Sequence, residues 1–157
     1  MIELKLKVGI VRYKNRQNKM LDINITNLAG FRILEKDIIA FAKKVFAELN
    51  ISNFELSIVL AEAKQMETWN TLYKHRAGST DVLSFPLESE DKKNKAGEVV
   101  LNWSDIESLA ASQNREPIAA LKYLLIHGIL HLSGYNHEGV SGQKSRAMMA
   151  RQSELTK

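Results

Sequence analysis

Apolar and polar residues alternate in two stretches within the first 25 positions of the chain. Every second residue from 2 to 10 is apolar (Ile2, Leu4, Leu6, Val8 and Ile10). A period of two predicts a strand with one buried face. The polar run 14–19 predicts a turn, and the apolar residues Leu21, Ile23 and Ile25 predict a second strand. These two strands could pair as a hairpin.

The apolar period changes after residue 33. Spacings of three and four predict an amphipathic helix over residues 34–49, with Asn50 ending it and a stripe of six apolar residues (Leu34, Ile38, Phe41, Ala42, Val45 and Leu49). Alternation returns at residues 54–60 and predicts a strand. Met66, Trp69 and Tyr73 then indicate a short helix over about 63–74.

The pattern of the next segment predicts shorter elements. Thr80 to Phe85 favours a strand that ends at Pro86, because proline cannot continue a central strand. Residues 88–96 are polar and indicate a mobile loop. Val99 to Leu101 predicts a brief strand. Ser104 and Glu107 fit a capping box, which predicts a helix over about 105–112.

Two helices are predicted in the last third of the chain. Pro117 suits the first turn of a helix whose buried stripe comprises Ile118, Leu121, Leu125, Gly128 and Leu132. A less amphipathic helix follows over about 142–154. Together the elements predict an α+β fold, with one layer of strands backed by helices, and a single domain over residues 1–157.

Composition narrows the class of protein. Hydrophobic residues make up 45% of the 157 and charged residues 25%, as in an ordinary soluble domain. The apolar runs are too short to span a bilayer, so we expect no membrane segment. The absence of cysteine excludes disulfides and thiolate metal sites, and it fits a cytoplasmic location.

The net charge of +4 is concentrated at the beginning of the chain. Residues 1–20 carry six basic side chains and one acidic one, a local +5, so the remaining residues sum to −1. A basic segment of this kind can follow a phosphate backbone, as in RNA. It can equally be a solvated strand and turn.

Three of the four histidines lie within eleven residues, with the spacing H-x3-H-x5-H. On a helix His127 and His131 stand one turn apart on the same face. Gly134 can end that helix in a left-handed conformation and let the chain return His137 to the pair. Three imidazoles with a fourth position open are typical of a catalytic zinc site. Nickel and copper also bind imidazole, but zinc is favoured.

Gly128 argues against a peptidase. Zinc peptidases of the H-E-x-x-H type have a glutamate base directly after the first histidine, and Gly128 occupies that position here. A peptidase or other small-molecule hydrolase would keep the ligands but lack that base. We expect Gly128 instead to allow close packing behind the metal.

The run from His127 to His137 resembles the signature H-G-x-L-H-L-x-G-Y-D-H of the YbeY family of bacterial endoribonucleases. Asn70 to Tyr73, Thr80 to Pro86 and Gly97 to Leu101 resemble other family segments in the same order. The likeness covers roughly residues 20–155.

The resemblance implies a zincin-like α+β domain, with a mixed sheet of about four to five strands, that acts on single-stranded RNA. It also implies a role in maturing the 3′ end of small-subunit ribosomal RNA and in ribosome quality control. The partners would be the small subunit and its assembly factors. His127, His131 and His137 match the metal ligands, which implies one zinc ion per chain.

Three features depart from the family pattern. Asn136 replaces the commoner aspartate before the third histidine, and it cannot act as a base. Lys74 stands where the family usually has arginine, with Arg76 two residues later; either could hold a phosphate, and Lys74 is favoured. Lysine lacks the bidentate fork of arginine. The basic strand predicted over residues 1–19 is extra relative to many relatives, and it could be an added edge strand or a choice of start site.

The sequence supports a mechanistic hypothesis without a general base. The metal, held partly by His131, would activate water or polarise a phosphodiester, and Lys74 would stabilise the added charge. Ser84 could line the cleft, although an ordinary strand position explains it as well. Asn136 and Asp81 are candidates to accept hydrogen bonds from the ligand imidazoles. The alternative is a non-catalytic, zinc-stabilised factor that binds RNA or the ribosome.

Overall fold

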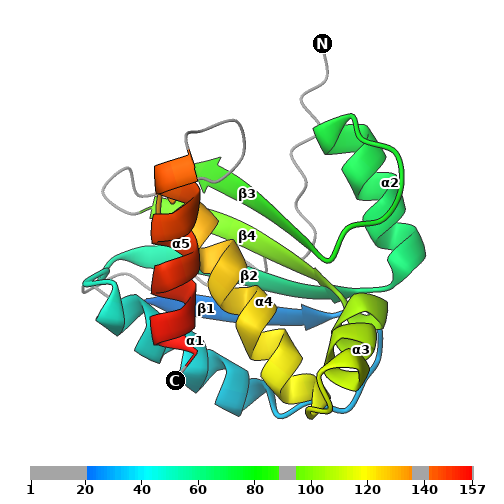
Figure 1. Ribbon diagram of the computed structural model, residues 1–157, viewed down its shortest axis with the longest axis horizontal. Coiled ribbons are helices and arrows are strands. Elements are labelled where there is room, and N and C mark those ends of the chain that lie inside the picture. Colours follow the sequence, from blue (N-terminus) through cyan, green and yellow to red (C-terminus); the bar gives the residue numbers. More distant parts are fainter. Residues whose placement is uncertain (1–20, 89–94, 136–141, 157) are drawn as a thin grey trace.

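The computed structural model describes residues 21–88, 95–135 and 142–156 (Figure 1). These ranges contain a four-stranded sheet and five helices, so the predicted α+β class is confirmed. The strands are β1 (Asp22–Asn27), β2 (Phe54–Ala61), β3 (Val82–Glu88) and β4 (Lys95–Asn102). The helices are α1 (Glu35–Glu48), α2 (Ala63–Lys74), α3 (Trp103–Ser112), α4 (Pro117–Leu132) and α5 (Gly142–Leu155).

The sheet is mixed, in the order β1-β2-β4-β3. Strands β1, β2 and β4 run parallel, and β3 runs antiparallel to β4. In the described part of the chain β1 pairs with β2. The first strand of the hairpin predicted over residues 2–25, and with it the basic segment 1–19, lies outside the described residues.

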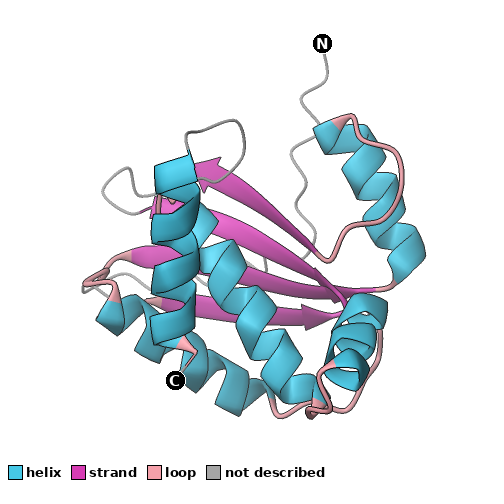
Figure 2. Ribbon diagram, in the orientation of Figure 1, coloured by secondary structure: helices cyan, strands magenta, loops and turns pink. Residues whose placement is uncertain are grey.

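The two faces of the sheet have different covers. Alternation along β2 sends Leu56, Ile58 and Leu60 into the larger core, which they share with α1, α3 and α4. Val59 and Ala61 point the other way and pack with Met66 of α2. Figure 2 shows α4 and α5 over the face that the viewer sees. Because seven of the eight residues of β2 are buried, apolar cover on both faces stabilises the centre of the sheet.

The predicted helices agree closely with the structure. α1, α2, α4 and α5 lie within one residue of the predicted boundaries or match them. Pro117 is the first residue of α4, and Asn50 follows α1 with φ of 56°. Ile118 is an exception, because 39% of its surface is exposed and it lies outside the buried stripe. No helix in the described ranges is both long and apolar enough to cross a membrane.

Three predicted boundaries in the middle of the chain are wrong. β3 continues through Pro86 to Glu88, because it lies at the edge of the described sheet and a missing N–H is tolerated there. β4 already begins at Lys95, so the polar segment before it is shorter than predicted. α3 begins at Trp103, and its N-cap is Asn102 rather than Ser104.

Candidate metal centre

Two of the three predicted metal ligands converge on α4. His127 and His131 are one helical turn apart, and their Nε2 atoms lie 3.1 Å from each other. The ring centroids are 4.8 Å apart and the ring planes meet at 70°. The predicted helical placement of this pair is therefore present in the structure.

The separation of the two nitrogens fits a single bound metal. Two nitrogens held tetrahedrally by zinc at about 2.0–2.1 Å lie about 3.3 Å apart. The observed Nε2–Nε2 distance of 3.1 Å is close to this value. His137 and Asn136 lie outside the described residues, and within the described ranges no group of three metal-binding side chains occurs. The three-histidine site therefore stays a prediction.

The second ring nitrogen of His127, Nδ1, contacts α5. It lies 3.1 Å from Oε1 of Gln152, and Nε2 of Gln152 donates to the carbonyl of Tyr123 at 3.1 Å. Gln152 is buried, with 4% of its surface exposed. The sequence analysis missed Gln152. A polar residue on the same helical face as buried Met148 was the signal that could have found it.

Gly128 brings α4 against the sheet. A Cβ atom at this position would lie 2.5 Å from Cγ1 of Val99 on β4, closer than packed carbon atoms can approach. The Oγ of Ser84 on β3 donates a long hydrogen bond of 3.4 Å to the Gly128 carbonyl. The expected packing role of Gly128 is thus confirmed. Ser84 lies directly beside the helix that carries the histidines.

Lys74 reaches the same strand from the end of α2. Its Nζ is 3.5 Å from the Ser84 carbonyl and 5.3 Å from the centroid of the Phe85 ring. Tyr73 packs edge-on against Phe85 with centroids 5.7 Å apart. β3 therefore connects Lys74 to Gly128 through Ser84. Ser84 thus contacts Lys74 through its carbonyl and the helix of the histidine pair through its hydroxyl.

Two further candidates lie elsewhere. Asp81 accepts hydrogen bonds from the Val82 N–H at 2.8 Å and the Thr80 hydroxyl at 3.4 Å, so its described bonds go to the start of β3 and not to a histidine. Arg76 lies in the exposed loop after α2. Its backbone N–H donates to the Asn70 carbonyl at 3.4 Å.

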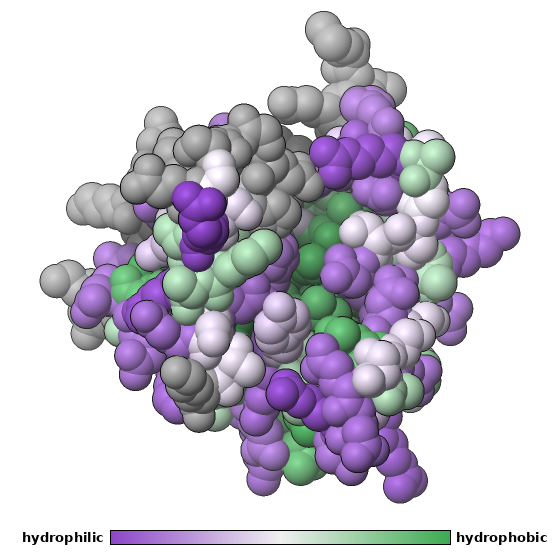
Figure 3. All heavy atoms as spheres, in the orientation of Figure 1, coloured by the Kyte–Doolittle hydropathy of each residue, from purple (hydrophilic) through white to green (hydrophobic). Residues whose placement is uncertain are grey.

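A pocket of about 600 Å³ lies next to Asp81, between the segment before β3 and helices α3 and α4. Asp105 lines the same pocket, and burial together with the charge of Asp81 raises its pKa. In Figure 3 the surface is hollowed between α4 and α2, where apolar atoms are visible between hydrophilic borders. This face thus offers apolar surface close to polar groups.

Glu98 is a buried carboxylate that the sequence analysis did not single out. It lies on β4 between Gly97 and Val99, both of which face α4, so alternation places its side chain on the opposite face of the sheet. Ser57 donates to its Oε2 at 3.0 Å. Burial raises the pKa of Glu98 to about 7, against the opposing effect of that hydrogen bond. Glu98 is therefore separate from the histidine pair.

Comparison with known proteins supports the resemblance seen in the histidine motif. The family model described as Endoribonuclease YbeY matches residues 13–157. The chain belongs to this family. Among YbeY relatives, that of Cutibacterium acnes is 34% identical over 73% of this chain and 80% of its own length. That of Persephonella marina is 33% identical over 85% and 89%.

A solved structure agrees with the fold. The solution structure of TM1509 from Thermotoga maritima is similar with a TM-score of 0.57 and 26% sequence identity. The match covers 87% of each chain. The fold described above is thus similar to that of an experimentally determined structure.

Proposed function

We propose that this YbeY-family chain is a zinc-dependent, single-strand-specific endoribonuclease of the cytoplasm. Its substrate would be ribosomal RNA, with cleavage maturing the 3′ end of the small-subunit RNA and serving ribosome quality control. The ribosomal small subunit and assembly factors would be its partners. The observation that carries the proposal is the 3.1 Å approach of the His127 and His131 Nε2 atoms, on a helix that Ser84 of β3 contacts at Gly128.

The residues of the chain divide the work of phosphodiester hydrolysis. His127 and His131, with His137, would hold one zinc ion. When bound, zinc polarises a phosphoryl oxygen and makes water a better nucleophile. Lys74, which lies over Phe85, would place its ammonium on the phosphate and stabilise the charge that develops during the reaction. A lysine serves here as a point charge.

The hollow beside α4 would select for single strands. Bases of an unpaired RNA can leave the stack and contact apolar surface, whereas bases of a duplex cannot. The half-buried rings of Tyr73 and Trp69 are occupied by packing against Phe85 and the smaller core. We therefore assign the two rings to the fold and not to base stacking.

The test compares two substitutions of the same kind. His131→Asn removes a proposed ligand, and His75→Asn changes the histidine that ends α2 with φ of 53°, a conformation that asparagine tolerates. Cleavage of end-labelled single-stranded and duplex RNA is measured with zinc, after chelation and after zinc is restored. We expect the His75→Asn protein to cleave single strands like the wild type, and the His131→Asn protein to lose at least 100-fold in rate.

Three outcomes would contradict the proposal. Cleavage by a zinc-free protein, or undiminished cleavage by His131→Asn, would remove zinc from the reaction. Failure of the wild type to cleave any RNA, together with ribosome binding that survives His131→Asn, would instead support the non-catalytic assembly factor.

A further inference from the structure

Gln152 makes two hydrogen bonds that together determine its orientation. An amide group has a donor side and an acceptor side. The carbonyl of Tyr123 can only accept, so the NH2 group of Gln152 must face it, at 3.1 Å. The amide oxygen then faces Nδ1 of His127, also at 3.1 Å. The Tyr123 carbonyl on α4 therefore determines the orientation of the Gln152 amide.

The orientation of Gln152 determines the tautomer of His127. A neutral imidazole carries one N–H donor and one acceptor nitrogen. An amide oxygen opposite Nδ1 requires the proton on Nδ1, which leaves the lone pair on Nε2. That nitrogen is the one directed at Nε2 of His131, 3.1 Å away. The hydrogen bond to Gln152 on α5 therefore leaves the Nε2 lone pair of His127 able to bind a metal.

We propose that Gln152 is a positioning residue for the metal centre: it fixes the Nδ1–H tautomer and the ring orientation of His127. This inference rests on the proposed function for the identity of the metal. Its physical basis is general, because partners that accept the second N–H of a metal-bound histidine commonly change metal affinity by about 10–100-fold when removed. The burial of Gln152 strengthens the effect, since only 4% of its surface meets water that could replace the bond.

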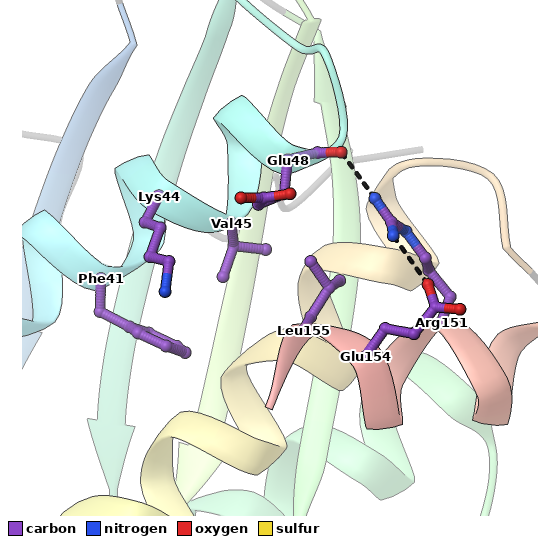
Figure 4. A pocket seen from close by; sticks show the side chains of 7 residues that line it. All are labelled: Phe41, Lys44, Val45, Glu48, Arg151, Glu154 and Leu155. Carbon is purple, nitrogen blue, oxygen red and sulfur yellow. Dashed lines mark hydrogen bonds and ion pairs between the residues drawn. The ribbon is translucent and has the colours of Figure 1, made fainter. Parts of the chain in front are cut away.

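A neighbouring residue supplies a matched control. Arg151 also joins α5 to another helix: its guanidinium donates to the Glu48 carbonyl at the end of α1 at 2.6 Å and to Glu154 at 2.8 Å (Figure 4). The figure shows this contact at a pocket between α1 and α5, whose lining residues do not include His127 or His131. Arg151→Met should thus loosen the attachment of α5 while leaving the bonds of His127 in place.

The experiment measures zinc affinity and tautomer separately. Zinc dissociation constants are obtained by competition with a chromophoric chelator for the wild type, Gln152→Leu, Arg151→Met and His127→Asn. The nitrogen chemical shifts of His127 are recorded by NMR on metal-free protein at pH 8.5, where imidazoles are ordinarily neutral. We expect Gln152→Leu to bind zinc 10–100-fold more weakly and to show a mixture of tautomers. Arg151→Met should resemble the wild type in both measurements.

The outcomes separate this inference from the proposed function. Zinc affinity within twofold of the wild type and an unchanged tautomer in folded Gln152→Leu would overturn the role of Gln152, even if His127→Asn abolishes binding. Equal weakening in Arg151→Met and Gln152→Leu would overturn it too, because a general loosening of α5 would then explain the loss. If the wild type binds no zinc, the proposed function fails, and the tautomer of metal-free Gln152→Leu still decides the inference.

Discussion

Steric restriction, and not a catalytic role, explains why position 128 is a glycine. A methyl group there would meet both Cγ atoms of Val99, at 2.5 and 2.9 Å, and Val99 is fully buried. We therefore expect Gly128→Ala to lower the free energy of unfolding by about 1–3 kcal/mol, despite the better helix propensity of alanine. Chemical denaturation measures the change.

The matched control for Gly128 lies in another helix. Among the described residues, Gly142→Ala places a methyl group near the flexible guanidinium of Arg146, at 3.4 Å, and should leave stability within about 0.5 kcal/mol of the wild type. Adding Val99→Ala to Gly128→Ala should cost less than Val99→Ala costs in the wild type, because the smaller residue makes room. A strictly additive double variant would contradict the steric explanation.

Glu98 makes stability depend on pH through its burial. Its pKa of about 7 in the folded chain exceeds the ordinary 4.5, so the folded state binds the proton more tightly than the unfolded state. The resulting stabilisation is complete below pH 4.5 and is lost as the pH rises through 7. Relative to Glu98→Gln, we expect the wild type to lose about 3 kcal/mol of unfolding free energy between pH 4 and 8.

The pH experiment uses metal-free protein, so that zinc binding by the histidines does not contribute. Urea unfolding at several pH values gives the difference between the two proteins. Ser57→Ala removes the hydrogen bond that opposes the effect of burial on the pKa of Glu98. The Ser57→Ala protein should therefore continue to lose stability up to a higher pH than the wild type. Parallel curves for the wild type and Glu98→Gln would show that Glu98 titrates normally.

At the scale of elements, Asn102 joins the beginning of α3 to the segment before β3. Its side chain accepts from the Ser104 N–H at 3.2 Å and donates to Ser79 at 2.9 Å and to Asp105 at 2.7 Å. It is 1% exposed. Asn102→Ala removes a helix cap and buried hydrogen bonds together, so we expect a loss of about 2–3 kcal/mol of unfolding free energy.

Ser108→Ala is the control for Asn102. The Ser108 hydroxyl donates to the Ser104 carbonyl within the same helix but is exposed, so its removal should change stability by less than about 0.5 kcal/mol. Thermal unfolding followed by circular dichroism measures both variants. A loss below 1 kcal/mol in Asn102→Ala would show that water replaces these bonds.

The sequence predicted the helices better than the sheet. Helical spacing of apolar residues is local, and it located α1, α2, α4 and α5 within one residue. The end of β3 at Pro86 was wrong because strand position, edge or centre, depends on which strand pairs with which. β4 was predicted too short because Gly97 and Glu98 do not look like strand residues until their neighbours are known.

The candidate site, like the fold, was predictable only where local geometry determines it. The i, i+4 pair His127 and His131 follows from local helical geometry, and its convergence was predictable. The contact of His127 with Gln152 joins residues 25 positions apart on two helices, and a pattern within one helix cannot predict it. Lys74 was selected by a family resemblance, and only the fold brings it to Ser84.

At the scale of the whole molecule, α4 is the common support of the site. It packs on β3 and β4 through Gly128, and it bonds to α5 through Tyr123 and His127. α5 in turn is attached to α1 through Arg151. A metal on α4 would therefore be connected to elements on both sides of the helix. Its binding should stabilise residues beyond the two histidines.

Zinc should stabilise the whole fold by mass action. If the folded chain binds zinc and the unfolded chain does not, free zinc at 100 times the dissociation constant adds about 2.7 kcal/mol to the free energy of unfolding. Hydrogen exchange should slow most in the second half of α4 and around Gln152 on α5, because His127 joins them. His75→Asn should keep this response and His131→Asn should lose it. Equal stabilisation of both variants by zinc would place the metal elsewhere in the chain, since the Nε2 of His131 lies 3.1 Å from that of His127.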